Sequence, residues 1–108
     1  MPAPFRAAKY AVISAGSSGD NTVVAAVTGK KIRVLSFFLV AAGAVTVRFE
    51  SGASGTALTG VMSLAANGGL SCAHNELGWF ETAAGVLLNL ELGGVVQVSG
   101  AITYIEVD

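Results

Sequence analysis

Charged residues are scarce in this chain. Only 12% of its 108 residues are Asp, Glu, Lys or Arg, about half the share of an average soluble domain, whereas 53% are hydrophobic. A chain of this length has room for one domain. It has too little polar surface to cover itself, so it either spans a membrane or buries part of its outside against copies of itself or a partner.

Long apolar runs are also missing. A membrane-spanning helix needs about 18 or more consecutive apolar residues. The most apolar stretch, residues 34–47, is too short and lies between Arg33 and Arg48, and the uncharged run 51–73 is interrupted by glycines. The first residues lack the apolar core of a secretion signal. We therefore expect a soluble protein that is synthesised in the cytoplasm and has no contact with a membrane.

Basic residues are few, and the formal net charge is −1. Lys30, Lys31 and Arg33 form the one basic cluster. Binding to nucleic acid requires many clustered Lys and Arg side chains, so we interpret this group as a solvated strand edge and expect no nucleic-acid partner.

The chain has one cysteine, Cys72, and one histidine, His74. An internal disulfide is excluded. A structural zinc site takes four protein ligands, which these two residues do not supply. A thiol nucleophile at Cys72 with His74 as its base is allowed by the spacing, because alternate residues of a strand share a face. We favour a polar loop over 71–76 and predict no enzymatic activity, no cofactor and no metal.

Other chemical signals are weak. The glutamates are dispersed, which does not favour a carboxylate pair for sugar hydrolysis. Trp79 beside Phe80 is typical of a core strand, although a sugar-stacking platform is the alternative. Asp20 and Asn21 predict a turn, since no alternating acidic ligands for calcium follow them. The glycines form no phosphate-binding motif.

The residues that are abundant predict strands. β-Branched residues, glycines and short alternating runs occur throughout, whereas apolar residues rarely repeat at helical spacing. Eight strands are expected, over residues 9–15, 22–27, 31–41, 45–50, 57–64, 79–82, 86–92 and 95–107. This pattern predicts an all-β fold, a two-sheet sandwich or barrel, over residues 9–108. Residues 1–8, with Pro2 and Pro4, are expected to form an extended N-terminal arm.

Two predicted strands break the alternation of apolar and polar residues. In residues 37–40 both faces are apolar, so either Phe37 and Leu39 or Phe38 and Val40 should meet another layer or another subunit. In the last strand one face is small and neutral and suits packing against a copy of itself. The candidate subunit-interface residues are Phe37, Phe38, Leu39, Val40, Ala101, Thr103 and Ile105.

The order of these segments resembles a family of small jelly-roll proteins from the heads of tailed bacteriophages. The resemblance rests on Gly-Lys-Lys-Ile-Arg-Val at 29–34, Leu-Ala-Ala-Asn-Gly-Gly at 64–69, and the segments 78–82, 85–90 and 98–104. It covers nearly the whole chain at the level of pattern.

This resemblance implies an eight-stranded jelly-roll sandwich that acts as a structural virion protein. Such proteins sit as homotrimers on the capsid surface, where they decorate or cement the major capsid protein. The alternative that it leaves open is a module of the phage tail or fibre that binds carbohydrate or another tail protein. No catalytic residues are implied.

Overall fold

The computed structural model describes residues 7–108, and within them it contains ten strands and no helix. The predicted all-β fold is therefore confirmed, whereas the prediction of eight strands is wrong. No segment in this range forms a helix that could cross a bilayer. Most of the expected N-terminal arm, residues 1–6, lies outside the described residues. The strands are β1 (Lys9–Ala15), β2 (Gly19–Val24), β3 (Lys31–Ala41), β4 (Val45–Ser51), β5 (Thr56–Ala57), β6 (Met62–Leu64), β7 (Gly69–Cys72), β8 (Phe80–Glu81), β9 (Leu88–Leu92) and β10 (Val98–Val107).

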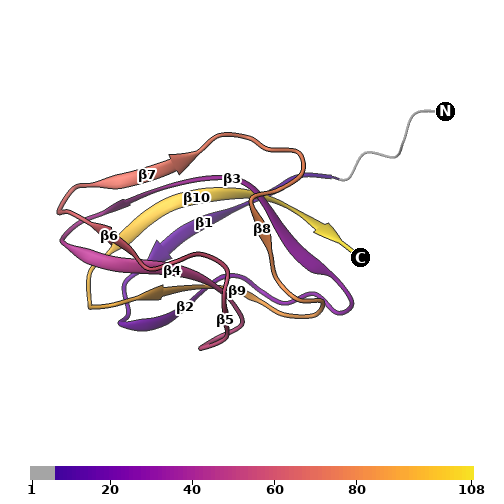
Figure 1. The fold of residues 1–108 in the computed structure, drawn as a ribbon, viewed down its shortest axis with the longest axis horizontal. Helices are drawn as coiled ribbons and strands as arrows, with labels where there is room; N and C mark the ends of the chain where they lie inside the picture. Colours follow the sequence, from indigo (N-terminus) through magenta and orange to yellow (C-terminus); the bar gives the residue numbers. More distant parts are fainter. Residues whose placement is uncertain (1–6) are drawn as a thin grey trace.

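The strands form two antiparallel sheets of five strands each, one above the other in Figure 1. Sheet A has the order β1-β10-β3-β7, and β8 pairs with β3 as well. Sheet B has the order β2-β9-β4-β5, and β6 pairs with β4 as well. Strands that are distant in sequence are thus neighbours: β1 pairs with β10, and β2 pairs with β9.

The two extra strands come from segments too short to show a period of two. The predicted strand over 57–64 is interrupted after β5 and resumes at β6, and β7 was not predicted at all. β5 and β8 contain two residues each, and β6 contains three. The predicted bounds of β1 and β3 agree with the structure.

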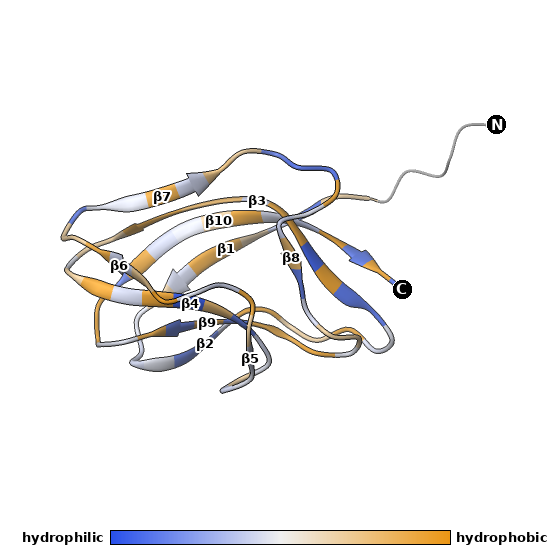
Figure 2. Ribbon diagram, in the orientation of Figure 1, coloured by the Kyte–Doolittle hydropathy of each residue, from blue (hydrophilic) through white to orange (hydrophobic). Residues whose placement is uncertain are grey.

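The main core lies between the sheets. Figure 2 shows apolar residues alternating with polar ones along β4, where Val45, Val47 and Phe49 point inward. Phe49 makes an edge-to-face contact with Phe37 of β3, with 5.1 Å between ring centroids, and lies 5.2 Å from Phe80 of β8. These rings join both sheets through apolar burial and favourable ring geometry.

A β-bulge in β3 changes which residues are buried. Thr103 of β10 pairs with Ser36 and Tyr104 pairs with Val34, so Leu35 has no partner in β10. Leu35 forms a second, smaller buried cluster with Ile105 and Val107. Ile105 is therefore covered within the single chain.

Candidate functional site

The outer face of sheet A, which points away from sheet B, is unusually apolar. Tyr10, Val12, Phe38 and Val40 expose 76%, 65%, 57% and 50% of their surface. The cross-strand register places Val12 next to Ala101, Ala101 next to Phe38, and Phe38 next to Ser71. We call the following residues outer face A, and none of them is charged: Tyr10, Val12, Ser14, Ser36, Phe38, Val40, Ser71, Ser99, Ala101 and Thr103.

The structure divides the seven interface candidates into two groups. Phe38, Val40, Ala101 and Thr103 belong to outer face A. The other three are covered within the chain: Phe37 and Leu39 are buried in the main core and Ile105 in the second cluster. Of the two pairs that the sequence left open, Phe37 with Leu39 points inward and Phe38 with Val40 points outward.

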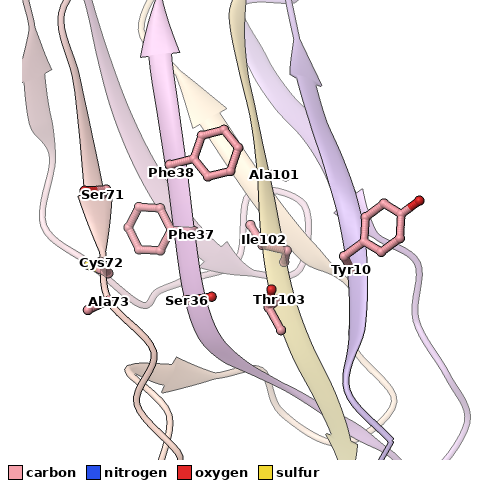
Figure 3. Close-up of a pocket in the computed structure, with 10 residues that line it drawn as sticks. All are labelled: Tyr10, Ser36, Phe37, Phe38, Ser71, Cys72, Ala73, Ala101, Ile102 and Thr103. Carbon is pink, nitrogen blue, oxygen red and sulfur yellow. The ribbon is translucent and has the colours of Figure 1, made fainter.

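A shallow groove of about 300 Å³ runs across outer face A. Figure 3 shows the Phe38 ring pointing from β3 over β10 toward Ala101, and the Tyr10 ring pointing away from β10 at the edge of the sheet. The hydroxyl groups of Ser36, Ser71 and Thr103 also line the groove. The groove therefore combines an apolar surface with a few uncharged hydrogen-bonding groups.

Polar groups border this face at both ends. At one end the amide of Gln97 donates hydrogen bonds to the hydroxyls of Ser14 and Ser99, at 3.1 and 3.2 Å. At the other end Arg33, which the register places next to Ile105, forms an ion pair with Glu81, with 2.8 Å between Nε and Oε1. An apolar centre with a polar border is the usual arrangement of a protein–protein interface.

Sheet B carries a cluster of three carboxylates, Asp20, Glu50 and Glu91, whose oxygens lie within 4.8 Å of one another. Arg48 pairs with Glu50 and, at 3.1 Å, with Glu91. The hydrogen bonds to Glu50 raise the pKa of the Arg48 guanidinium. The Asn89 amide donates to Asp20 at 2.8 Å and to Glu50 at 2.9 Å, and both Asn89 and Glu50 are fully buried.

This cluster is internally satisfied. The backbone N–H and hydroxyl of Ser54 donate to the Asp20 carboxylate, each at 2.9 Å, and these bonds lower the pKa of Asp20. Every buried side-chain nitrogen and oxygen in the described part of the chain has a partner. The cluster therefore holds the turn after β4 against β2, and leaves no free buried ligand for a metal.

The weaker candidates lie in β7 and the loop that follows it. Cys72 ends β7 and packs against the core, whereas His74 is exposed in the loop, and no hydrogen bond joins the two in residues 7–108. Phe80 packs in the core, as the sequence predicts. Trp79, which we had also interpreted as core, is half exposed, and its Nε1–H donates to the Ala73 carbonyl at 2.9 Å.

Sequence comparisons give no relative to set beside this geometry. No protein-family model matches the chain, and a search of curated proteins returns no significant match.

Proposed function

We propose that the chain is a self-associating structural protein whose copies meet through outer face A. The supporting observation is that this face carries four exposed apolar side chains and no charge. Because the face is neutral, a second copy can approach it without like-charge repulsion. The same face on another copy offers matching apolar surface.

A stable contact would cover a modest share of the surface of the chain. A standard interface buries about 800 Å² per partner, which is about one seventh of the 5694 Å² that the chain exposes. Buried apolar area contributes roughly 25 cal/mol per Å², although lost freedom on association offsets much of this gain. Placing Tyr10 and Phe38 inside the contact would supply the aromatic anchors that dominate many interfaces.

We also propose that the sandwich is a jelly roll. The strand pairs are nested, since β1 pairs with β10, β2 with β9, β3 with β7 and β8, and β4 with β5 and β6. If β5 with β6, and β7 with β8, are each counted as one interrupted strand, each sheet has four strands. Eight strands in two sheets is the jelly-roll number.

Together with the resemblance to phage head proteins, this supports a specific role. We propose a homotrimeric decoration or cement protein on the capsid surface that contacts the major capsid protein. Antibodies against the chain should label the heads of particles from a phage that encodes it, in negative-stain electron micrographs. Labelling confined to tails would favour the tail alternative, and particles without label would contradict a virion role.

Self-association is tested by light scattering across a dilution series. The wild-type chain should show a mass above that of a monomer, and Phe38→Glu should shift it to monomer because a buried charge is costly. Val61→Glu is the matched control, since Val61 is 60% exposed and precedes β6 outside outer face A. A monomeric wild type, or equal dissociation by both variants, would contradict the proposal.

The half-exposed Trp79 favours a second candidate, a carbohydrate-binding module. Aromatic faces stack on sugar rings, and the bond from Nε1 to Ala73 fixes the orientation of this indole. A saturable quenching or blue shift of Trp79 fluorescence by host-cell glycans would support this function. An emission spectrum unchanged by glycans would remove it.

A further inference from the structure

Sheet A has one long edge strand, β1, that lies beyond β10 (Figure 3) and lacks the usual protections of an edge. Exposed edges are commonly blunted by short strands, bulges, prolines or charges. One edge of each sheet is made of strands of two to four residues, β7 and β8 in sheet A and β5 and β6 in sheet B. β2, at the other edge of sheet B, has an irregular register beside β9. β1 instead pairs with β10 in an unbroken register over seven residues, and its one charged residue is Lys9 at its start.

Alternate residues of β1 direct their backbone groups toward this open edge. The N–H of Ala42 donates to the Gln97 carbonyl at 2.8 Å, which sets the phase of the ladder between β3 and β10. Because the backbone groups of a strand alternate between its two neighbours, those of Gly100 and its partner Ile13 belong to the ladder between β10 and β1. The residues whose N–H and C=O groups point away from β10 are therefore Tyr10, Val12 and Ser14. No described residue hydrogen-bonds to these backbone groups.

We infer that β1 of one copy pairs antiparallel with β1 of a second copy, so that sheet A continues from one copy into the other. Among the described strands β1 alone offers a long and regular free edge, so a second copy supplies the partner that fits it. Antiparallel pairing of two identical strands is two-fold symmetric and closes at a dimer. This contact joins copies in pairs and is separate from the contact proposed on outer face A.

One register satisfies the whole edge. With Val12 opposite its counterpart, Tyr10 lies opposite Ser14, and the three N–H and three C=O groups of each edge all find partners. A shift by two residues leaves some of these groups unpaired, and a shift by one places core-facing side chains beside outward-facing ones. Lys9 lies opposite Ala15, so no like charges meet. Outer face A then extends across both copies without a charge.

Amide hydrogen exchange, read by NMR, tests the edge directly. The N–H groups of Tyr10, Val12 and Ser14 should exchange rapidly in the diluted monomer, because they lack a partner within the described chain. When nine tenths of the chains are paired, exchange should be roughly tenfold slower, since it proceeds through the remaining monomer. The Val95 amide, in an exposed loop before β10, is the control and should not change.

The outcomes of this measurement separate the two contacts. A contact through outer face A alone covers side chains but does not hydrogen-bond these amides. Rapid exchange in an assembly seen by light scattering would therefore overturn the inference and leave the proposed function standing. Slow exchange in the monomer would also overturn the inference, because another part of the same chain would then cover the edge. A chain that stays monomeric at every concentration would overturn both.

A proline at the centre of the contact tests the backbone bonds. Val12→Pro removes an N–H that has no partner within the described chain, and it keeps an apolar side chain on outer face A, so its cost to the fold should be small. It should raise the dissociation constant of the pair at least roughly tenfold and abolish the protection of the Tyr10 and Ser14 amides. Val12→Ala keeps the N–H and is the matched control, which should retain the protection. Protected amides in Val12→Pro would overturn the inference.

Disulfide trapping tests the register. In the proposed pair the two Val12 Cα atoms lie about 5.5 Å apart, within the range of a disulfide. Ala101 lies next to Val12 on β10, so its Cα is three strand spacings, roughly 14 Å, from its counterpart. With Cys72→Ser to remove the native thiol, Val12→Cys should oxidise to dimers through this edge, whereas Ala101→Cys cannot. Dimers from Ala101→Cys and none from Val12→Cys would place the contact on outer face A and overturn the inference.

Discussion

Two adjacent phenylalanines allow the core and the proposed interface to be separated in one experiment. Phe37 is almost fully buried and stacks edge-to-face on Phe49 at 5.1 Å, whereas Phe38 is 57% exposed. Phe37→Ala removes a buried ring and leaves a cavity, which costs about 3–5 kcal/mol. Phe38→Ala removes surface area alone in the single chain, so its cost in the monomer should stay within about 0.5 kcal/mol.

Urea denaturation followed by circular dichroism measures both costs. With a slope of about 2 kcal/mol per M, Phe37→Ala should lower the unfolding midpoint by roughly 2 M. Association stabilises the folded state in a concentration-dependent manner, so the wild-type midpoint should rise with protein concentration. The Phe38→Ala midpoint should match that of wild type at high dilution and lose this dependence. Equal losses for the two variants at high dilution would refute the assignment of the inner and outer faces.

Three further predictions concern the fold. Glu50→Ala leaves a buried N–H of Asn89 without its acceptor and should lower the free energy of unfolding, measured by urea denaturation, by about 1–3 kcal/mol. Glu91→Ala breaks a partly exposed ion pair and should lower it by less than about 1 kcal/mol. A larger loss in Glu91→Ala than in Glu50→Ala would contradict the hydrogen-bond network described for sheet B. Gly100→Ala should lower the melting temperature, because the new Cβ would lie 1.9 Å from the Phe38 carbonyl oxygen. Gly94→Ala is the control and should leave the melting temperature unchanged, because the space around Gly94 is open. An unchanged melting temperature in both variants would show that β10 and β3 lie farther apart than described. Hydrogen bonds from Ser54 lower the pKa of Asp20, and the hydrogen bond from Arg33 lowers the pKa of Glu81. Both carboxylates therefore stabilise the fold at a pH above their unfolded pKa values, which are near 4. This stability is lost as the pH falls through their lower folded pKa values. Urea midpoints between pH 6 and 2 should fall on acidification, less steeply in Asp20→Asn, and a midpoint that rises below pH 4 would contradict this.

The sequence was sufficient to predict the strands that show a clear period of two. Residues 45–50 and 86–92 alternate, and the structure forms β4 and β9 there. Strands of two or three residues carry no periodic signal, so the sequence predicted β5 and β6 as one strand, whereas β8 lies within the predicted strand 79–82. The bulge at Leu35 depends on how β3 aligns with β10, and the sequence of either strand alone does not show that alignment.

The candidate site was also predictable only in part, because it depends on strand register. The doubly apolar stretch 37–40 indicated an uncovered face but not which residues formed it, because a shift of one residue exchanges the two faces. The cluster on sheet B was missed because pairing of β4 with β9 brings Arg48 and Glu50 beside Glu91. The sequence shows the polar residues at alternate positions of these two strands, but it does not show that the two strands pair.

Hydroxyl-radical footprinting of the wild-type assembly measures directly whether outer face A is covered. At a concentration where light scattering shows the oligomer, Tyr10 and Phe38 should be protected, while Leu77 and Trp79 should be modified as exposed residues. Dilution to the monomer should restore the labelling of Tyr10 and Phe38. Labelling of Tyr10 and Phe38 in the oligomer as strong as in the monomer would show that the copies meet elsewhere.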